Sequence, residues 1–354
     1  MKKISSYQFI AILLCSKLFC IMTYIPDEDD NSAIILISIA LTIIIEALLV
    51  IPIIAFYNKN NGEGLLSFAS SKSRVLGIGV SILFLLFSLW SIIETMGDLT
   101  FFLQYCFFDT YASWAVIIVI SATAFYVAHT GISNLARISG IILITTIICL
   151  GLIFLGFKYH VDIIELNIAV AKPVSAVAKT IPKLLASAKE IVAFVILLDA
   201  LRSNVGKTIY SYLGTTAVIT LISATIVIVV LQNFVYLSKL PFFTLSAYSQ
   251  TKIIQHYEGF FMVLWTLCAL IKLTLFTICV QHCIHQILPN LNSLVGQGAT
   301  LAVAGAITLP FMIIQKWEAV TAPKLEALFV VVLVFAIPLL MLLFRKRKAV
   351  QEVD

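Results

Sequence analysis

The stretch Ser5–Pro26, SSYQFIAILLCSKLFCIMTYIP, is long and apolar enough to cross a membrane as a helix, yet Lys17 lies near its middle. A spanning helix needs about 20 mostly apolar residues. Lys17 is roughly 12 Å along a helix from Ile25, further than a lysine stem of about 6 Å reaches. We therefore expect its ammonium to meet a partner on another helix or a water-filled cavity; the alternative is a lysine that snorkels or is deprotonated.

The composition of the whole chain indicates a polytopic membrane protein. Hydrophobic residues make up 61% of the 354 residues and charged residues 12%, about half of the ~25% that is usual in globular proteins. Polar stretches are too short to build a soluble domain, so a single transmembrane domain over 1–354 is expected. Lys17 interrupts the apolar run and no cleavage site of small residues follows it, which favours an uncleaved first span over a signal peptide.

Apolar runs along the chain predict an all-α protein with ten membrane spans. The segment 158–189 includes the stretch NIAVAKPVSAVAKTIPKLLASAK, with four lysines among Ala, Val and Pro. We expect it to be an amphipathic segment at the membrane interface or one that re-enters the membrane. The spans are expected at about 5–26, 33–57, 75–104, 111–129, 137–157, 191–201 with its polar continuation RSNVGKTIY, 210–232, 257–287, 297–315 and 325–344.

The order of the spans predicts an inverted repeat of five plus five helices. The first repeat covers about 5–157 and the second about 189–345, with spans one and six each interrupted and each carrying a central charge. Odd numbers of spans invert the second half, and paired interrupted spans indicate a transporter-type binding site. Lys and Arg gather in the loops on one side, which predicts cytoplasmic termini and explains the net charge of +5 without nucleic-acid binding.

Charged residues inside the spans are expected to form the functional interior. Each costs about 2.5–3.5 kcal/mol at a helix centre, so pairing is favoured. We hypothesise that Lys17 faces Asp199 where spans one and six cross; the alternative is that each pairs elsewhere, for example Lys17 with Glu94. The two basic and four acidic residues of this set are Lys17, Glu46, Glu94, Asp98, Asp199 and Lys272.

Other motifs give little support for an enzyme or a metal site. The group Cys279, His282, Cys283 and His285 has helical spacing but lacks a second ligand pair elsewhere, which favours packing over metal binding. The chain has no HExxH, GxSxG, Walker A or GxGxxG motif. We therefore expect a protein that is not an enzyme and has no cofactor.

The segment Leu240–Phe276, LPFFTLSAYSQTKIIQHYEGFFMVLWTLCALIKLTLF, resembles the B subunits of spore germinant receptors. These are amino-acid-permease-like proteins of endospore-forming bacteria, within the amino acid–polyamine–organocation superfamily. The matching positions are Pro241, Phe242, Glu258, Trp265 and Lys272. The opening ISSYQFIAILL with Pro26, and Glu190 at the start of span six, are also similar. The resemblance implies ten helices in a LeuT-like inverted repeat, with spans one and six unwound around an amino-acid site.

Two departures from the family pattern affect this implied site. Phe19, Cys20, Ile21, Met22 and Thr23 replace the small glycines that usually precede the closing proline of span one, and glycine permits close approach to backbone. Asp199 stands where the family often has a proline. The residues implied in ligand binding or coupling are Lys17, Cys20, Ile21, Thr23, Trp90, Glu94, Asp98, Asp199 and Lys272.

The resemblance implies a germinant-sensing subunit of the bacterial cell membrane or inner spore membrane. Such a subunit contacts membrane lipid, binds a small amino-acid-like germinant, and acts with an A subunit and a lipoprotein C subunit. One alternative is a proton-coupled amino-acid transporter, in which the Lys272 ammonium replaces a sodium ion between spans one and eight. Another is a structural membrane subunit with a sealed pocket.

Overall fold

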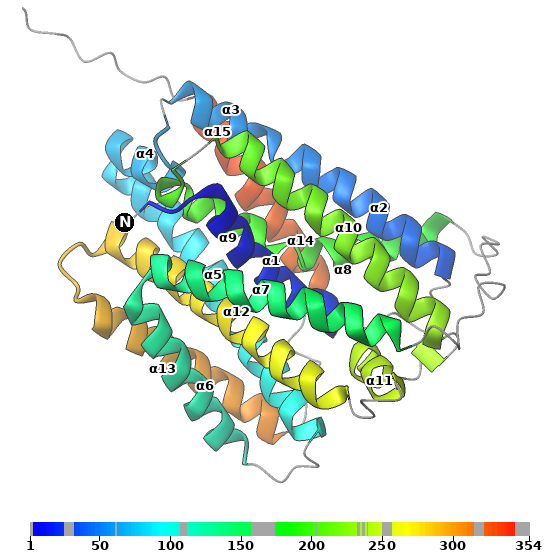
Figure 1. Cartoon of the computed structure of the whole chain (residues 1–354). Helices are drawn as coiled ribbons and strands as arrows, with labels where there is room; N and C mark the ends of the chain where they lie inside the picture. The colour runs from blue at the N-terminus through cyan, green and yellow to red at the C-terminus, as the bar shows by residue number, and fades with distance from the viewer. Residues whose placement is uncertain are drawn as a thin grey trace, which may run out of the picture.

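The computed structural model describes residues 3–24, 32–60, 62–106, 112–156, 174–202, 204–231, 234–235, 238, 240–249, 257–314 and 322–343, and these are almost entirely helical (Figure 1). The helices are α1 Ser6–Thr23, α2 Ser32–Leu49, α3 Ile51–Lys59, α4 Leu65–Lys72, α5 Arg74–Cys106, α6 Ser113–Thr130, α7 Ile132–Leu155, α8 Val174–Ala186, α9 Lys189–Ile196, η2 Leu198–Ala200, α10 Val205–Leu231, α11 Pro241–Tyr248, α12 Glu258–Ile287, α13 Ser293–Ile313, α14 Pro323–Val331, the π-helical η5 Val332–Ala336 and α15 Ile337–Leu343.

Nine membrane spans are recognisable in the described residues from helix length and apolar composition. The second span joins α2 and α3, and the last joins α14, η5 and α15. The predicted sixth span at 191–201 corresponds to α9 and η2, which are too short to be counted alone. Counted together with α8 before them as one interrupted span, they bring the described residues to the ten spans that the apolar runs predict.

The sixth span is interrupted, but its first half lies where the sequence predicts an interfacial segment. Helix α8 packs against α2 and α14, and the chain then breaks at Ser187–Ala188 before α9 begins. The polar stretch that was expected to complete the crossing instead leads into α10. Helix α8 is amphipathic, because Lys179 is exposed while Leu184 and Leu185 on the other side are buried. Residues 157–173 lie outside the described part of the chain.

The first span is continuous, so the predicted interruption within it is wrong for the described residues. Helix α1 runs unbroken from Ser6 to Thr23, and no glycine or proline in that range weakens it. Ser5 begins the helix with a capping box, in which its hydroxyl accepts from the Gln8 amide and its own amide donates to the Gln8 side chain. Pro26 lies outside the described residues.

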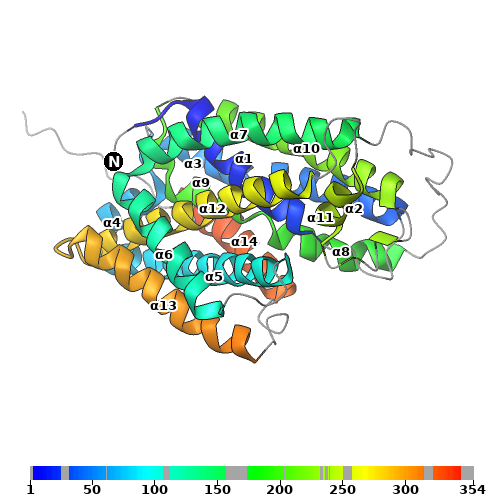
Figure 2. The ribbon, with the colours of Figure 1, turned by 60° about the horizontal axis from the view of Figure 1, so that its bottom comes forward.

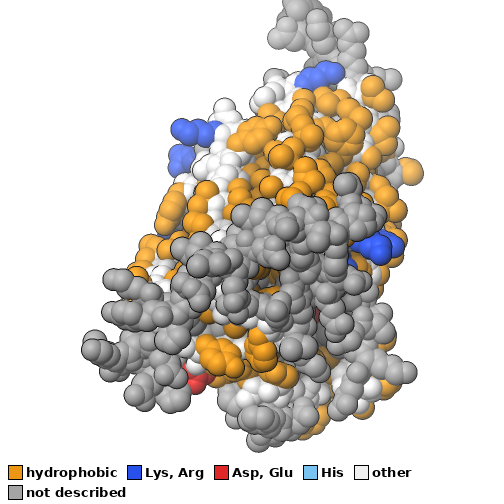
Figure 3. Space-filling view, turned by 90° about the vertical axis from the view of Figure 1, so that its right-hand side faces the viewer, with side chains coloured by type: hydrophobic (Ala, Val, Ile, Leu, Met, Phe, Trp, Pro, Cys, Tyr) orange, Lys and Arg blue, Asp and Glu red, His pale blue; other side chains and the backbone are white. Residues whose placement is uncertain are grey.

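Helices α1 and α12 form the centre of the bundle. Helix α12 packs against α5, α1, α6, α7 and α13 and crosses the middle of the view in Figure 2. Trp265 of α12 stacks on Phe102 of α5 and Phe19 of α1, with ring centroids 3.9 and 4.8 Å away. Aromatic rings therefore fill the space between these three helices. On the end of the bundle seen in Figure 3, the described side chains are mostly hydrophobic, with Lys and Arg near the edges.

The residues before α1 are tied to the end of the sixth span. Ile4 and Leu201 form a parallel bridge: the Ile4 amide donates to the Ala200 carbonyl at 2.8 Å, and the Arg202 amide donates to the Ile4 carbonyl at 3.1 Å. Span one therefore starts beside the point where span six ends. Opposed directions of these two spans are what an inverted repeat requires.

Candidate functional site

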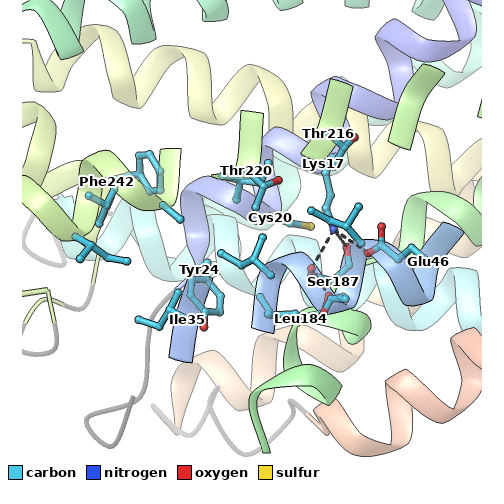
Figure 4. A pocket seen from close by; sticks show the side chains of 17 residues that line it. Lys17, Cys20, Tyr24, Ile35, Glu46, Leu184, Ser187, Thr216, Thr220 and Phe242 are labelled. Atoms are coloured by element: carbon cyan, nitrogen blue, oxygen red, sulfur yellow. Dashed lines mark hydrogen bonds and ion pairs between the residues drawn. The ribbon is translucent and has the colours of Figure 1, made fainter. Parts of the chain in front are cut away.

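Three lysines meet carboxylates or backbone close to the Ser187–Ala188 break, and each comes from a different helix. The first is Lys17 of α1, whose ammonium donates to the Ser187 carbonyl at 3.0 Å and to its hydroxyl at 3.1 Å. The same nitrogen lies 3.9 Å from a carboxylate oxygen of Glu46 on α2 (Figure 4). The hypothesis that Lys17 pairs with Asp199 is therefore wrong, and so is the example alternative of Glu94.

Asp199 instead caps a short helix in the connection between spans two and three. Its carboxylate accepts from the Gly64 amide at 2.6 Å and from the Ser67 hydroxyl at 3.0 Å. Gly64, the residue before α4, has no side chain that could cap the helix. The Asp199 carboxylate accepts the hydrogen bond of its amide instead, and its negative charge interacts favourably with the positive end of the helix dipole. A Cβ on Gly64 would clash with a carboxylate oxygen of Asp199. Asp199 is placed at the end of span six, one turn beyond α9, and not beside Lys17.

Lys189, the first residue of α9, is held between two carboxylates. Its ammonium contacts Glu94 of α5 and lies 2.7 Å from Glu326 of α14. Glu326 also accepts from the Trp90 indole at 3.1 Å and from the Ala322 amide at 3.3 Å. We call Glu94, Lys189 and Glu326 the α5–α9–α14 triad. Glu94 and Trp90 are among the predicted site residues, whereas Lys189 and Glu326 are not.

Lys272 of α12 reaches the polar face of α1. Its ammonium lies 2.7 Å from the Cys20 sulfur, 3.9 Å from Glu190 and 5.2 Å from the centre of the Phe19 ring. Glu190 is fully buried and accepts from the Ser16 hydroxyl at 2.8 Å. The ammonium thus lies between the first, sixth and eighth spans.

The remaining predicted residues surround this centre. Asp98 interacts electrostatically with Lys272. Thr23 accepts a hydrogen bond from the Trp265 indole at 3.2 Å. Pro241 begins α11 and Glu258 begins α12. Cys279, His282, Cys283 and His285 all lie on α12, and no three His, Cys, Asp or Glu side chains of the described residues lie close enough to hold a metal.

A small pocket, part of it open to the surroundings, lies between α1, α2, α8 and α10. Lys17, Glu46 and Ser187 are at one end, and Tyr24 and Phe242 are at the other (Figure 4). The Thr220 hydroxyl in its wall is buried and makes no hydrogen bond to the described residues. We call this the Lys17 pocket. Cys20 and Ile21 also line it, whereas Thr23, Trp90, Glu94, Asp98, Asp199 and Lys272 do not; its other lining residues are Ile35, Ile39, Thr42, Ile43, Leu184, Thr216, Ala224, Val227 and Ile228.

Comparison with known proteins agrees with this architecture. The sequence model of a family described as "Spore germination protein" matches residues 3–320. The chain belongs to the spore germination protein family. No curated protein matches it.

The fold of this spore germination protein is also found in a sodium-coupled transporter. A structure titled "Substrate-bound outward-open state of a Na+-coupled sialic acid symporter reveals a novel Na+-site" superposes with a TM-score of 0.57 at 15% sequence identity. The match covers 93% of this chain and 76% of the symporter. The protein is therefore an integral membrane, permease-like protein with a LeuT-like fold, and not an enzyme.

Proposed function

We propose that this spore germination protein is the membrane subunit of a germinant receptor, and that it binds a small amino-acid-like germinant in the Lys17 pocket. The observation that carries the proposal is the pairing of a buried cation with a buried anion at the break in span six. Broken helices in this type of fold offer backbone groups to a ligand. Here the Lys17 ammonium already uses the Ser187 carbonyl.

The chemistry of the pocket suits a zwitterion with an apolar side chain. Lys17 offers an ammonium to a ligand carboxylate, and Glu46 offers a carboxylate to a ligand amine. The Lys17 nitrogen and the Glu46 oxygen are 3.9 Å apart, which is longer than a hydrogen bond. A ligand that binds between them therefore breaks no direct hydrogen bond between these two side chains. The isoleucines of α2 and Phe242 supply an apolar wall, and the Thr220 hydroxyl is available as a further donor or acceptor.

The A and C partner subunits and the orientation belong to the same proposal. Cytoplasmic termini, supported by the Lys and Arg of the loops, place the Tyr24 and Phe242 end of the pocket toward the outer surface. A germinant arriving from outside then meets the apolar end first and the charged end last. The subunit signals germination only with its partners, which distinguishes it from a transporter that acts alone.

Ligand binding to the purified protein tests this proposal. A panel of L-amino acids is expected to contain at least one that raises the melting temperature. Lys17→Met and Glu46→Gln are each expected to lower the affinity for that ligand at least about tenfold, or about 1.4 kcal/mol of binding free energy. Asp199→Asn is the control, because Asp199 lies outside the pocket and its variant keeps the affinity. Absence of any ligand effect, with all variants folded, would favour the structural subunit with a sealed pocket.

A proton-coupled amino-acid transporter is the second candidate, favoured by the position of the Lys272 ammonium. An ammonium between spans one and eight replaces the sodium ion that this fold commonly holds there, and removes the need for sodium. Labelled ligand that enters vesicles of the purified protein under a pH gradient would support the transporter. Uptake that requires sodium would contradict the role given to Lys272.

A further inference from the structure

The α5–α9–α14 triad has more acidic than basic groups and is largely buried. Two carboxylates, Glu94 and Glu326, share one ammonium, that of Lys189. Lys189 and Glu326 are 2% and 5% exposed. If all three groups are ionised, one uncompensated negative charge lies inside the membrane domain, where isolated charges are strongly disfavoured.

The described surroundings of the triad do not supply the missing positive charge. Glu326 and Trp90 border a groove between α5 and α14 whose other lining residues are apolar, Phe87 and Phe329 among them. Of the nearby charged residues on packed elements, Lys272 faces Glu190 and Cys20. Asp98, one turn further along α5, is acidic. The lysines of α8, which packs against α14, are the exposed Lys179 and the half-buried Lys183. Lys324 of α14 is exposed, and Lys189 is the lysine that acts on the Glu326 carboxylate.

A metal cation is a poor candidate for this charge. The Lys189 ammonium already contacts both carboxylates and occupies the position between them. A second cation there would face the ammonium directly. A proton on one carboxyl group neutralises the triad without needing any further space.

The two carboxylates differ in what they accept. Glu326 receives hydrogen bonds from the Trp90 indole and the Ala322 amide in addition to the Lys189 contact, and such donors favour the ionised form. Glu94 interacts only with Lys189 among the described residues, and its side chain is the more exposed of the two, at 20%. The proton is therefore better accommodated on Glu94.

We propose that the α5–α9–α14 triad is a proton-binding site, in which Glu94 carries the proton while Lys189 and Glu326 remain an ion pair. Lys189 is the first residue of α9, directly after the break in span six. Gain or loss of this proton therefore changes the electrostatic attraction between Glu94 and the start of α9. The site is separate from the Lys17 pocket and does not depend on the proposed germinant binding.

Infrared spectroscopy of the purified protein tests the site, because a protonated carboxyl group absorbs apart from a carboxylate. Glu94→Gln, which resembles the protonated side chain in shape and charge, is expected to remove the signal of one protonated carboxyl group per molecule. Its melting temperature at neutral pH is expected to equal that of the wild type. Glu326→Gln removes the excess negative charge, so Glu94 ionises, and the same signal is expected to disappear. Glu63→Gln, at an exposed position outside the spans, is the control for both measurements.

Three results would overturn the proposal. In the first, Glu94→Gln leaves the carboxyl signal intact. In the second, it fails to fold or melts well below the wild type while Glu63→Gln is normal, which would show that an ionised Glu94 is needed. In the third, sodium or potassium stabilises the wild type but not Glu94→Gln, which would assign the triad to a metal cation.

Discussion

Lys272→Met is expected to destabilise the protein by about 3–5 kcal/mol, the usual effect of removing one partner of a buried ion pair. The loss is large because Glu190 is fully buried and, among the described residues, keeps Ser16 and Cys20 as its hydrogen-bond donors. Its second carboxylate oxygen makes no hydrogen bond to the described residues. Thermal or denaturant unfolding in detergent measures the effect.

A second variant separates lost charge from lost packing. Lys272→Met combined with Glu190→Gln removes both charges, and we expect it to recover most of the stability lost in Lys272→Met. If the double variant is as unstable as the single one, other contacts of Lys272, such as that of its ammonium with the Phe19 ring, would be more important than the ion pair.

Gly64→Ala is expected to cost about 2–3 kcal/mol, since the new methyl group pushes the Asp199 carboxylate away from the amide that it caps. Asp199→Ala alone loses the cap and is expected to cost about 1–2 kcal/mol. In the Asp199→Ala background, Gly64→Ala has no carboxylate to displace. We therefore expect it to cost much less there, and a double-mutant cycle measures this coupling.

Gly79 provides a matched control for Gly64. It lies within α5, and a Cβ built on it meets no atom within 4 Å. Gly79→Ala is thus expected to be neutral, or to stabilise by about 0.5–1 kcal/mol through improved helix propensity. Equal destabilisation by both substitutions would show that the contact with Asp199 is unimportant.

The spans were predictable because each membrane-spanning helix needs a long run of apolar residues. Most of the ten spans match a described helix closely, and the parts that do not are informative. Helix α8 was predicted as an amphipathic interfacial segment and not as part of span six, because its lysines lower the mean hydropathy of the segment although Lys179 lies away from the buried side. Span one was expected to be interrupted because of its central charge and because of the family resemblance, but its described residues contain nothing that breaks a helix.

The partners of the intramembrane charges were much harder to predict. Sequence identifies which side chains need a partner, but the choice depends on which helix faces are adjacent in three dimensions. Lys17 met Glu46 of the neighbouring span and not Asp199. Glu326 lies one turn after Pro323 at the start of the last span, where a carboxylate resembles an ordinary interfacial residue. Only the three-dimensional structure shows that Glu326 forms an ion pair with Lys189.

The bridge between Ile4 and Leu201 has a consequence for how the protein is made. At roughly 5–20 residues per second, a ribosome needs roughly 10–40 s to synthesise the chain that separates these two residues. During that interval, Lys17 of span one can pair with Glu46, which is synthesised early, but its hydrogen-bond acceptor Ser187 has not yet been made. The bridge at the start of the protein therefore forms only after more than half of the chain has been synthesised.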